Sequence, residues 1–361
     1  MIHDVAIVGA GMAGASLAAA IGARARVVLI EAEDMPGRHA TGRSAAFWSE
    51  TYGGPAVQPL TTASGPVLRD GGYLTPLGSL HIGRTGDGTL AERLLHDFAG
   101  SGVDLSRVDP AAYVPGLRAD WVHGVWEPSC AYIDVAAVHA DYLAAAKASG
   151  AGVMTDAALL SATRRGGVWR LDTRAGPVAA RVLVDAAGAW ADQVAALAGV
   201  APIGITPYRR TMVQLRTDPP APDGLPHVVD LAGGFYFKPE AGGRLWLTPH
   251  DESPSLPCDI APEEWDVAVA IDRLEKVVDW RVEAVERRWA GLRSFAPDRA
   301  PVYGFDAKVP GFFWCAGQGG FGIQTAPAAA AMAAALLLGE GDMPHGVDAD
   351  RYRAGRFPDT G

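Results

Sequence analysis

The chain has 361 residues, of which 49% are hydrophobic, so it is long enough to bury the cores of two packed units. Its formal net charge is −10 and it contains no basic run, which argues against nucleic acid or an anionic membrane surface as a partner. The three cysteines lie far apart and show neither a disulfide framework nor the spacing of zinc ligands. No export signal is visible, so we expect a cytoplasmic protein.

The N-terminal segment carries a dinucleotide-binding pattern. An apolar strand leads into Gly9, Gly11 and Gly14, an alanine-rich helix follows, and a second strand ends at Glu31. Gly9 permits the tight turn, Gly11 lets a pyrophosphate approach the N–H groups at the helix start, and Gly14 lets the helix pack close to the strand. Glu31 can accept hydrogen bonds from an adenosine ribose and disfavours a 2′-phosphate. This pattern therefore favours FAD or NAD over NADP.

The loop after the second strand is predicted to form the floor of the cofactor site. It contains a Pro-Gly turn and two arginines, Arg38 and Arg43. Thr41 or Ser44 could cap a short helix whose N–H groups face the pyrophosphate. The alternative for both arginines is a solvated surface charge.

The rest of the sequence alternates between segments of short or antiparallel strands and segments in which a strand leads through a glycine turn into a helix. Short strands and one helix over 90–99 suggest an insertion between residues 73 and 134. A helix over 135–149, a hairpin over 159–173 and a strand over 181–185 lead to a second glycine turn at 186–190, which could equally be an ordinary crossover. Residues 202–247 predict an antiparallel sheet, and a helix over 262–278 and a strand over 285–289 follow. A glycine cluster at 317–322 joins a strand over 312–315 to an apolar helix over 326–338, which is too short to span a membrane.

The whole chain resembles the D-amino acid oxidase superfamily of FAD enzymes, and within it the D-arginine dehydrogenases. Matching stretches run from end to end, at residues 9–15, 39–46, 133–135, 186–190, 235–242, 289–295 and 311–325. The resemblance favours FAD over NAD. It implies an α/β fold, α+β overall, in which a Rossmann-like FAD-binding domain carries an antiparallel-sheet substrate domain. The implied boundaries are 1–72, 133–205 and 289–361 for the discontinuous FAD-binding domain, and 73–132 and 206–288 for the substrate-binding domain.

The resemblance also implies how FAD is held. In the family, the last glycine turn lies near the flavin pyrimidine, where helix N–H groups stabilise the negative charge of reduced flavin. Residues 300–303 lack the cysteine by which sarcosine-oxidase-like relatives attach flavin, and Cys315 is expected in the core, so we expect noncovalent FAD and no metal. The expected cofactor-binding residues are Gly9, Gly11, Ala13, Gly14, Glu31, Arg38, Thr41, Arg43, Ser44, Ala45, Ala187, Gly188, Trp190, Gly291, Arg293, Gly319, Gly320, Gly322, Ile323 and Gln324.

The family holds the substrate α-carboxylate with two arginines, which match Arg210 and Arg293. Two guanidinium forks suit a carboxylate, and the phenol of Tyr236 can donate to the same group. Arg209 and Arg210 are adjacent, so on a strand only one of them can enter the site, and the match selects Arg210. Tyr52 matches a tyrosine on the mobile loop over the site, with a half-buried packing tyrosine as the alternative. The expected partner is thus a small carboxylate molecule.

Departures from the D-arginine dehydrogenases bear on the substrate side chain. Phe47 stands in place of a histidine near the amine, and Ser49 in place of a threonine. Ser79 or a near neighbour stands where those enzymes offer a glutamate to the guanidinium tail, although Glu50 could substitute in part. We therefore predict a neutral or apolar substrate side chain. The expected substrate pocket comprises Phe47, Ser49, Ser79, Gly320 and Gln324.

The implied reaction is transfer of the Cα hydride of a D-amino acid to flavin N5, followed by hydrolysis of the imine to a 2-oxo acid and ammonia. One alternative is oxidation of a 2-hydroxy acid or an N-methyl amino acid, because Arg210, Arg293 and Tyr236, the carboxylate clamp, would hold the carboxylate of these substrates equally well. Another is a noncatalytic flavin-binding protein, which the intact clamp disfavours. The sequence leaves the electron acceptor open among dioxygen, a quinone and a protein carrier.

Overall fold

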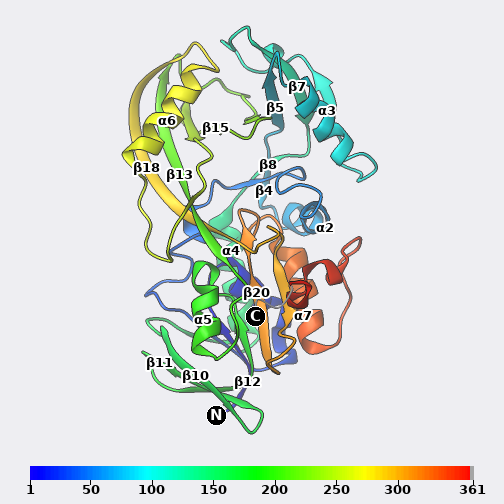
Figure 1. Ribbon diagram of the computed structural model, residues 1–361, viewed down its shortest axis with the longest axis vertical. Coiled ribbons are helices and arrows are strands. Elements are labelled where there is room, and N and C mark those ends of the chain that lie inside the picture. Colours follow the sequence, from blue (N-terminus) through cyan, green and yellow to red (C-terminus); the bar gives the residue numbers. More distant parts are fainter. Residues whose placement is uncertain (358–361) are drawn as a thin grey trace.

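The computed structural model describes residues 1–357 and has three sheets, two of them large (Figure 1). The apolar runs at the N-terminus and before the later glycine turns form the centre of an eight-stranded sheet, because strands buried on both faces need continuous apolar sequence. Its strands follow the order β10-β11-β12-β1-β2-β9, and β20 pairs with β12 and β19. The strands are β1 His3–Val8, β2 Val27–Ile30, β9 Gly152–Met154, β10 Leu159–Arg165, β11 Val168–Thr173, β12 Val178–Asp185, β19 Val302–Phe305 and β20 Phe312–Ala316.

Helices cover both faces of this sheet. One hydrophobic cluster joins one face to α1 and α7, and a second joins the other face to α5. Pairings of β1 with β2 and β12, of β2 with β9 and of β12 with β20 are parallel. These three layers form the dinucleotide-binding half of the molecule. The helices are α1 Met12–Ile21, α2 Gln58–Asp70, α4 Val135–Ala148, α5 Ala191–Leu197 and α7 Ala326–Leu338, with 3-10 turns η1 Gly22–Arg24, η2 Thr41–Arg43, η4 Gly188–Trp190, η5 Ala349–Tyr352 and η6 Ala354–Arg356.

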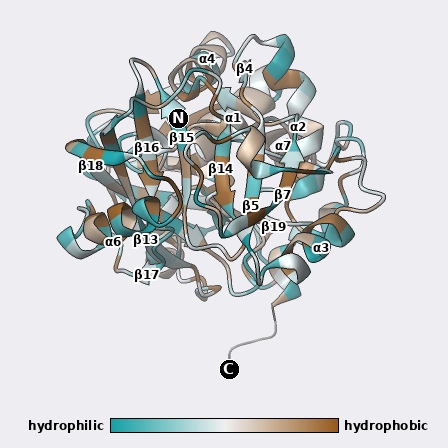
Figure 2. Cartoon of the chain, turned by 90° about the horizontal axis from the view of Figure 1, so that it is seen from above, coloured by the Kyte–Doolittle hydropathy of each residue, from teal (hydrophilic) through white to brown (hydrophobic). Residues whose placement is uncertain are grey.

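The second large sheet has ten strands in the order β21-β18-β13-β16-β15-β14-β5-β7-β6, with β17 on β13. Helix α6 buries an apolar stripe against it, whereas its outer face is hydrophilic, and both colours are visible along α6 (Figure 2). The elements are β5 Ser79–Arg84, β6 Ser106–Val108, β7 Trp121–Glu127, β13 Thr206–Asp218, β14 His227–Asp230, β15 Tyr236–Glu240, β16 Arg244–Thr248, β17 Ser253–Pro254, β18 Arg281–Phe295, β21 Gln318–Gly319, α3 Gly88–Asp97, α6 Glu264–Glu275 and η3 Pro110–Ala112.

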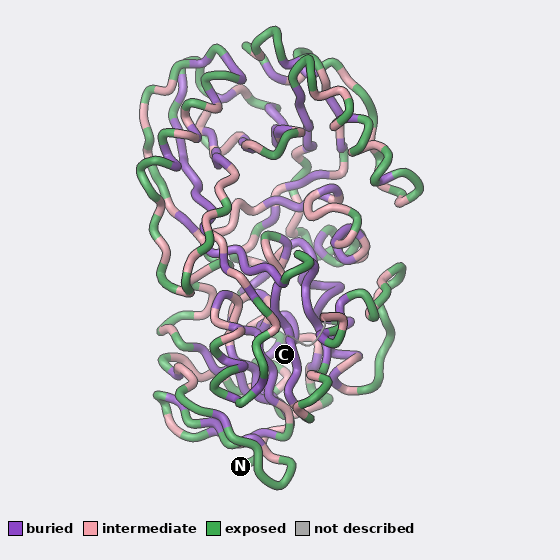
Figure 3. The backbone as a smooth tube through the Cα atoms, in the orientation of Figure 1, coloured by how far each residue is buried: buried purple, intermediate pink, exposed green. Residues whose placement is uncertain are grey.

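A small third sheet lies between the two large ones, in the order β3 Phe47–Trp48, β8 Ala131–Ile133 and β4 Leu74–Pro76. Buried residues follow the strands of both large sheets, whereas the peripheral loops are exposed (Figure 3). Within residues 1–357, no helix has both the length and the apolar character needed to cross a bilayer. The predicted boundaries between domains stay a prediction, and the last predicted segment, 289–361, includes residues 358–361, which lie outside the described residues.

The mixed α/β fold predicted from the sequence is confirmed, with three differences in detail. The strand predicted over 285–289 is much longer, β18, because its first half alternates charged and half-buried residues along a sheet surface and has no apolar run. The helices predicted over 90–99 and 262–278 are shorter or shifted, at Gly88–Asp97 and Glu264–Glu275. The sheet predicted as antiparallel contains one parallel pair, β14 with β5, through which the segment 73–132 joins the same sheet.

Candidate active site

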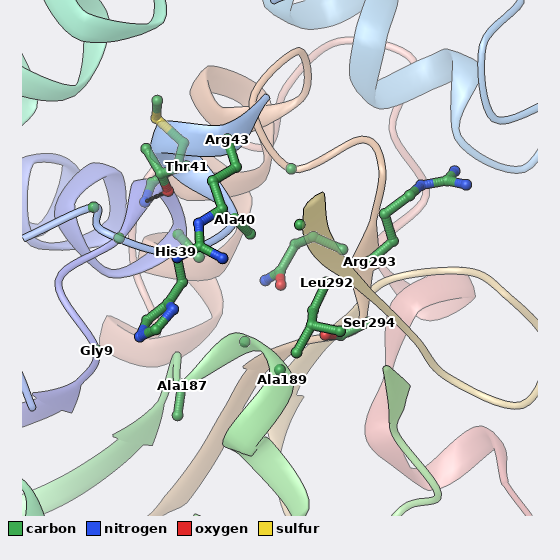
Figure 4. A pocket seen from close by; sticks show the side chains of 18 of the residues that line it. Gly9, His39, Ala40, Thr41, Arg43, Ala187, Ala189, Leu292, Arg293 and Ser294 are labelled. Carbon is green, nitrogen blue, oxygen red and sulfur yellow. Dashed lines mark hydrogen bonds between the residues drawn. The ribbon is translucent and has the colours of Figure 1, made fainter. Parts of the chain in front are cut away.

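A cavity of about 440 Å³ lies between the two large sheets. Its walls come from the β1–α1 turn, the loop after β2, the turn after β12, strands β13 and β18, and the turn before α7. Gly9, His39 and Ala187 lie on one side of the cavity and Arg293 on the other (Figure 4). The structure brings together all the predicted cofactor residues except Gly14, together with Phe47, Tyr52, Arg210 and Tyr236.

The β1–α1 turn has the geometry that a bound pyrophosphate needs. Gly9 has φ +98°, and a Cβ there would collide with the carbonyl oxygen of Ala186. A Cβ at Gly14 would collide with the carbonyl oxygen of Gly9, so Gly14 sets the packing of α1 on the turn and lies outside the cavity lining. Gly11 is the N-cap of α1 and lines the cavity without a side chain to cover the helix N–H groups.

Glu31 is fixed at the carboxyl end of β2, where it lines the cavity. Its Oε2 accepts a hydrogen bond from Ala10 N at 2.8 Å, and its Oε1 accepts one from Glu33 N at 3.1 Å. Each carboxylate oxygen can accept more than one hydrogen bond, so the side chain can still receive hydroxyl donors. This arrangement fits the ribose of a dinucleotide.

The prediction that Thr41 or Ser44 caps its own short helix is wrong. Residues 41–43 form the 3-10 turn η2, which has no side-chain cap. Thr41 Oγ1 accepts a hydrogen bond from Met12 N at 3.0 Å and so satisfies one N–H group of α1. Ser44 Oγ accepts one from Ala46 N. No local pattern predicts this contact, because Thr41 and Met12 are 29 positions apart.

The two arginines of this loop have different surroundings. Arg38 is 45% exposed at the side chain and pairs with the carboxylates of Glu33 and Asp34, as a surface charge does. Arg43 is 19% exposed, donates from Nη1 to the carbonyl oxygens of Ile260 and Ala290, and pairs with Asp259. Arg43 therefore ties the loop to β18 and to the segment before α6.

The neighbouring arginines of β13 point to opposite sides of the sheet, as the alternation of a strand requires. Arg209 pairs with Glu263 and, at 3.0 Å, with Asp266, away from the cavity. Arg210 lines the cavity and is 5% exposed. Its Nε donates to Asp251 O at 2.9 Å and its Nη2 to Glu252 Oε1 at 3.2 Å. Nη1 is buried and has no hydrogen-bond partner within residues 1–357.

Arg293 on β18 lies beside Arg210. Its Nη1 donates to Glu252 Oε1 at 2.9 Å, and its buried Nε has no partner among the described residues. A Cβ at Gly320 would come within 2.5 Å of that Nε, so only glycine lets the guanidinium lie flat against the turn before α7. Burial, and then the charge of Arg293, lower the pKa of Arg210. The pair is a concentration of positive charge with two buried donors that have no partner in the described chain.

Aromatic side chains surround the space beside the arginines. Phe47 contacts Tyr52 and Tyr236 edge to face, with ring centroids 4.8 and 5.5 Å apart. Tyr236 is 3% exposed, and burial raises the pKa of its phenol, which keeps the proton available for donation. Among residues 1–357 its hydroxyl donates only to Met212 Sδ, at 3.6 Å, which is a weak acceptor. The imidazoles of His227 and His250 border the same aromatic cluster, with ring centroids 4.3 Å from Phe47 and 5.6 Å from Tyr236, and burial lowers the pKa of both.

Ser49 and Ser79, two predicted pocket residues, do not line the cavity. Ser49 Oγ donates to Glu127 Oε2 at 2.9 Å, and Ser79 Oγ contacts His227 Nδ1 at 3.1 Å. Glu127 is fully buried and also accepts from Thr51 Oγ1 at 2.6 Å. Burial alone would raise the pKa of Glu127, but hydrogen bonds from His81, Thr51 and Ser49 lower it below its usual value.

Sequence reasoning missed Glu127, because an isolated acid in a strand of the insertion carries no motif. Glu50, considered as a substitute acid, accepts a hydrogen bond from the exposed Thr62 and does not line the cavity. Gln324 lines the cavity, and its side chain holds the segment 49–52 and α2: Oε1 accepts from Ser49 N, and Nε2 donates to Tyr52 O and Thr61 Oγ1.

The three layers, the glycine turn and the acid after β2 define a protein with a dinucleotide-binding fold. The cavity begins at that turn and continues to the arginine pair, so the residues present fit a long cofactor with a reactive end near Arg210. The chain belongs to the FAD-dependent oxidoreductase (DAO) family, whose model matches residues 4–336. Its cofactor is FAD, on which this family depends.

Among curated proteins, the chain is 25% identical over 360 residues to the bifunctional protein ThiO/ThiG of Nostoc sp. PCC 7120, a match that covers 94% of this chain and 53% of that protein. It is 27% identical over 189 residues to the hydrogen cyanide synthase subunit HcnC of Pseudomonas aeruginosa, covering 51% of this chain and 43% of HcnC. The chain thus spans about half the length of the curated relatives that it matches.

Solved structures show the same fold over nearly the whole chain. L-proline dehydrogenase from P. horikoshii superimposes with a TM-score of 0.86 at 21% identity, covering 98% of this chain and 97% of that one. Glycine oxidase from Geobacillus kaustophilus superimposes with a TM-score of 0.83 at 23% identity, covering 99% of both chains. At these identities the likeness establishes the fold.

Proposed function

We propose that this flavoenzyme oxidises the Cα–N bond of an amino acid with a neutral side chain, whose carboxylate is held by Arg210 and Arg293. The supporting observation is the pair of unpartnered donors, Arg210 Nη1 and Arg293 Nε, both buried on side chains that line the cavity. A buried donor without an acceptor costs about 1–3 kcal/mol. A carboxylate between the two guanidinium groups would remove that cost, and the flat geometry of the guanidinium suits this ligand.

The residues around the clamp would orient the substrate and exclude water. Tyr236 would exchange its weak bond to Met212 Sδ for the substrate carboxylate, since burial keeps the phenol protonated. Phe47 and Tyr52 would cover the reacting carbon. Bound FAD would accept the Cα hydride from a substrate whose amine is neutral, which leaves an iminium. Water then converts the iminium to a 2-oxo acid and ammonium.

The surroundings beside the clamp support a neutral side chain, because they are aromatic or apolar apart from two imidazoles whose pKa burial lowers. Phe47, Met212 and Tyr236 form a buried cluster beside the clamp. The nearby acid Glu127 is already committed to Ser49 and Thr51, so a cationic side chain would be desolvated without a free counter-ion. The D configuration rests on the resemblance to D-arginine dehydrogenases.

The test is anaerobic mixing of the FAD-loaded protein with both enantiomers of neutral, acidic and basic amino acids, with flavin absorbance as the readout. We expect neutral D-amino acids to bleach the flavin fastest and arginine and lysine to act slowly. Reduction by L-amino acids alone would overturn the configuration, and absence of reduction by any carboxylate compound would overturn the proposed activity in favour of a noncatalytic flavoprotein. Repeating the reaction in air tests whether dioxygen is the electron acceptor.

A second candidate is oxidation of a secondary amine such as an N-methyl amino acid. Phe47 places an apolar ring where a polar contact to a primary amine would be expected, and the structural neighbours include an L-proline dehydrogenase, whose named substrate is a secondary amine. Sarcosine and N-methyl amino acids belong in the same experiment, together with 2-hydroxy acids. Faster reduction by an N-methyl compound than by its primary amine would favour this candidate.

A further inference from the structure

The two clamp arginines share a carboxylate that belongs to the protein. Glu252 Oε1 lies 2.9 Å from Arg293 Nη1 and 3.2 Å from Arg210 Nη2, although these arginines come from different strands. The same oxygen lies 2.8 Å from Nη2 of Arg299, which is half exposed. Glu252 does not itself line the cavity, so it contacts the guanidinium groups from outside the ligand space.

The turn that carries Glu252 is built around the same arginines. Residues 249–252 connect β16 to β17, and Asp251 O accepts from Arg210 Nε at 2.9 Å. The Asp251 carboxylate accepts from Thr211 N at 2.7 Å and so binds the turn to β13 next to Arg210. His250 has φ +57°, a conformation that is unfavourable for a non-glycine residue and persists only where its surroundings impose it.

These contacts fix which donors face the ligand. Arg210 uses Nε and Nη2 on the turn and keeps Nη1, whereas Arg293 uses Nη1 and keeps Nε. Without Glu252, Arg210 would keep only its bond to the Asp251 carbonyl, whereas Arg293 would have no acceptor in the described chain and could rotate away from the like charge of Arg210. We propose that Glu252 is a positioning residue that holds Arg210 and Arg293 in one arrangement with two free donors, and thereby sets the orientation of the substrate carboxylate.

This inference rests on the proposed function, since it presupposes a carboxylate substrate. Loss of the Glu252 carboxylate should lower the limiting rate of flavin reduction but leave the affinity for the substrate nearly unchanged. Removal of the negative charge of Glu252 leaves the attraction of the arginines for an anion intact or stronger, so the substrate dissociation constant should not rise by more than about threefold. A misoriented substrate reacts slowly, and a displacement of about 1 Å can cost on the order of a hundredfold. The limiting rate of flavin reduction should therefore fall at least about tenfold.

The experiment compares wild type, Glu252→Gln and the control Glu283→Gln by anaerobic stopped-flow titration with the best substrate of the wild type, with thermal unfolding measured in parallel. Glu283 pairs with Arg216 and Arg281 at the outer surface of β18, so its replacement removes an ion pair of the same sheet away from the cavity. We expect the limiting rate to fall only in Glu252→Gln. A limiting rate of Glu252→Gln within about twofold of wild type would overturn the proposal.

Glu252→Asp keeps the negative charge and provides a second test in case Glu252→Gln does not fold or does not bind flavin. In Glu252→Asp the carboxylate is withdrawn by one methylene and cannot bridge both arginines. We expect its limiting rate to fall as well, and a wild-type rate in Glu252→Asp would also overturn the proposal. Failure of the proposed function looks different, because wild type itself would then not be reduced by any carboxylate compound.

Discussion

Replacing Arg210 by methionine should abolish most carboxylate binding while the adjacent replacement, Arg209→Met, should leave it intact. Both side chains are long, both are at most 11% exposed, and both carry ion pairs, but only Arg210 lines the cavity. A hydrogen bond from a charged donor contributes about 1.5–3 kcal/mol. Loss of the Arg210 Nη1 donor should therefore raise the dissociation constant of a carboxylate ligand by roughly ten- to 150-fold.

The assay is titration of each oxidised variant with a nonreacting carboxylate such as benzoate, with the visible flavin spectrum as the readout, followed by stopped-flow reduction by the wild-type substrate. Arg209→Met should lose stability, because it leaves Glu263 and Asp266 without their partner, but should keep the wild-type affinity within about threefold. Equal affinities of Arg210→Met and wild type would refute the assignment of Arg210 to the carboxylate. Equal losses in both variants would show a general effect on β13.

Three further results are expected. Gly14→Ala should destabilise the FAD-loaded protein by about 1–3 kcal/mol and lower its flavin content, because the new methyl group meets the Gly9 carbonyl; thermal unfolding and the ratio of flavin to protein absorbance measure this. Tyr236→Phe should weaken benzoate binding about fivefold, the effect of one neutral donor of roughly 1 kcal/mol, with no change if the phenol does not reach the ligand. Burial lowers the pKa of His250 from 6.5 to about 3, so between these pH values the unfolded chain binds one more proton than the folded chain, and the free energy of unfolding should fall by about 2 kcal/mol from pH 7 to pH 5. Urea unfolding at both pH values should show this loss in wild type and a smaller loss in His250→Asn, because asparagine tolerates the positive φ of this position.

The cofactor half of the molecule could be predicted because its constraints are local. The turn at Gly9 needs a positive φ and Gly14 needs a missing Cβ, and both requirements appear directly as residue type at fixed spacing. The apolar helix over 326–338 was predicted with its observed bounds, because an alanine-rich apolar segment between Thr325 and Gly339 leaves little freedom at either end.

The substrate half depends on contacts between distant segments, which single residues do not reveal. Glu127 meets Ser49 across 78 positions, and Glu252 meets Arg293 across 41. The alternation of β13 was enough to predict that Arg209 and Arg210 diverge, but it could not show which acids receive them. Strand β18 was predicted too short for a related reason, since its exposed first half is held by pairing with β13 and not by its own hydrophobicity.

The arginines that line the cavity differ in how many of their N–H groups already have a hydrogen-bond acceptor in the protein, so residue type alone does not reveal their roles. Arg43 and Arg210 both line the cavity, and both are conspicuous in the sequence as cations near a predicted anion site. Arg43 directs Nη1 to two carbonyl oxygens and Nη2 to Asp259, so it joins two segments of the chain. Arg210 and Arg293 each retain one buried donor with no acceptor in the described chain. Because a buried donor without a partner is unfavourable, a ligand is expected where two such donors also line a cavity. Arg209 Nε is buried without a partner as well, but it lies outside the cavity lining, so the cavity decides between the two places.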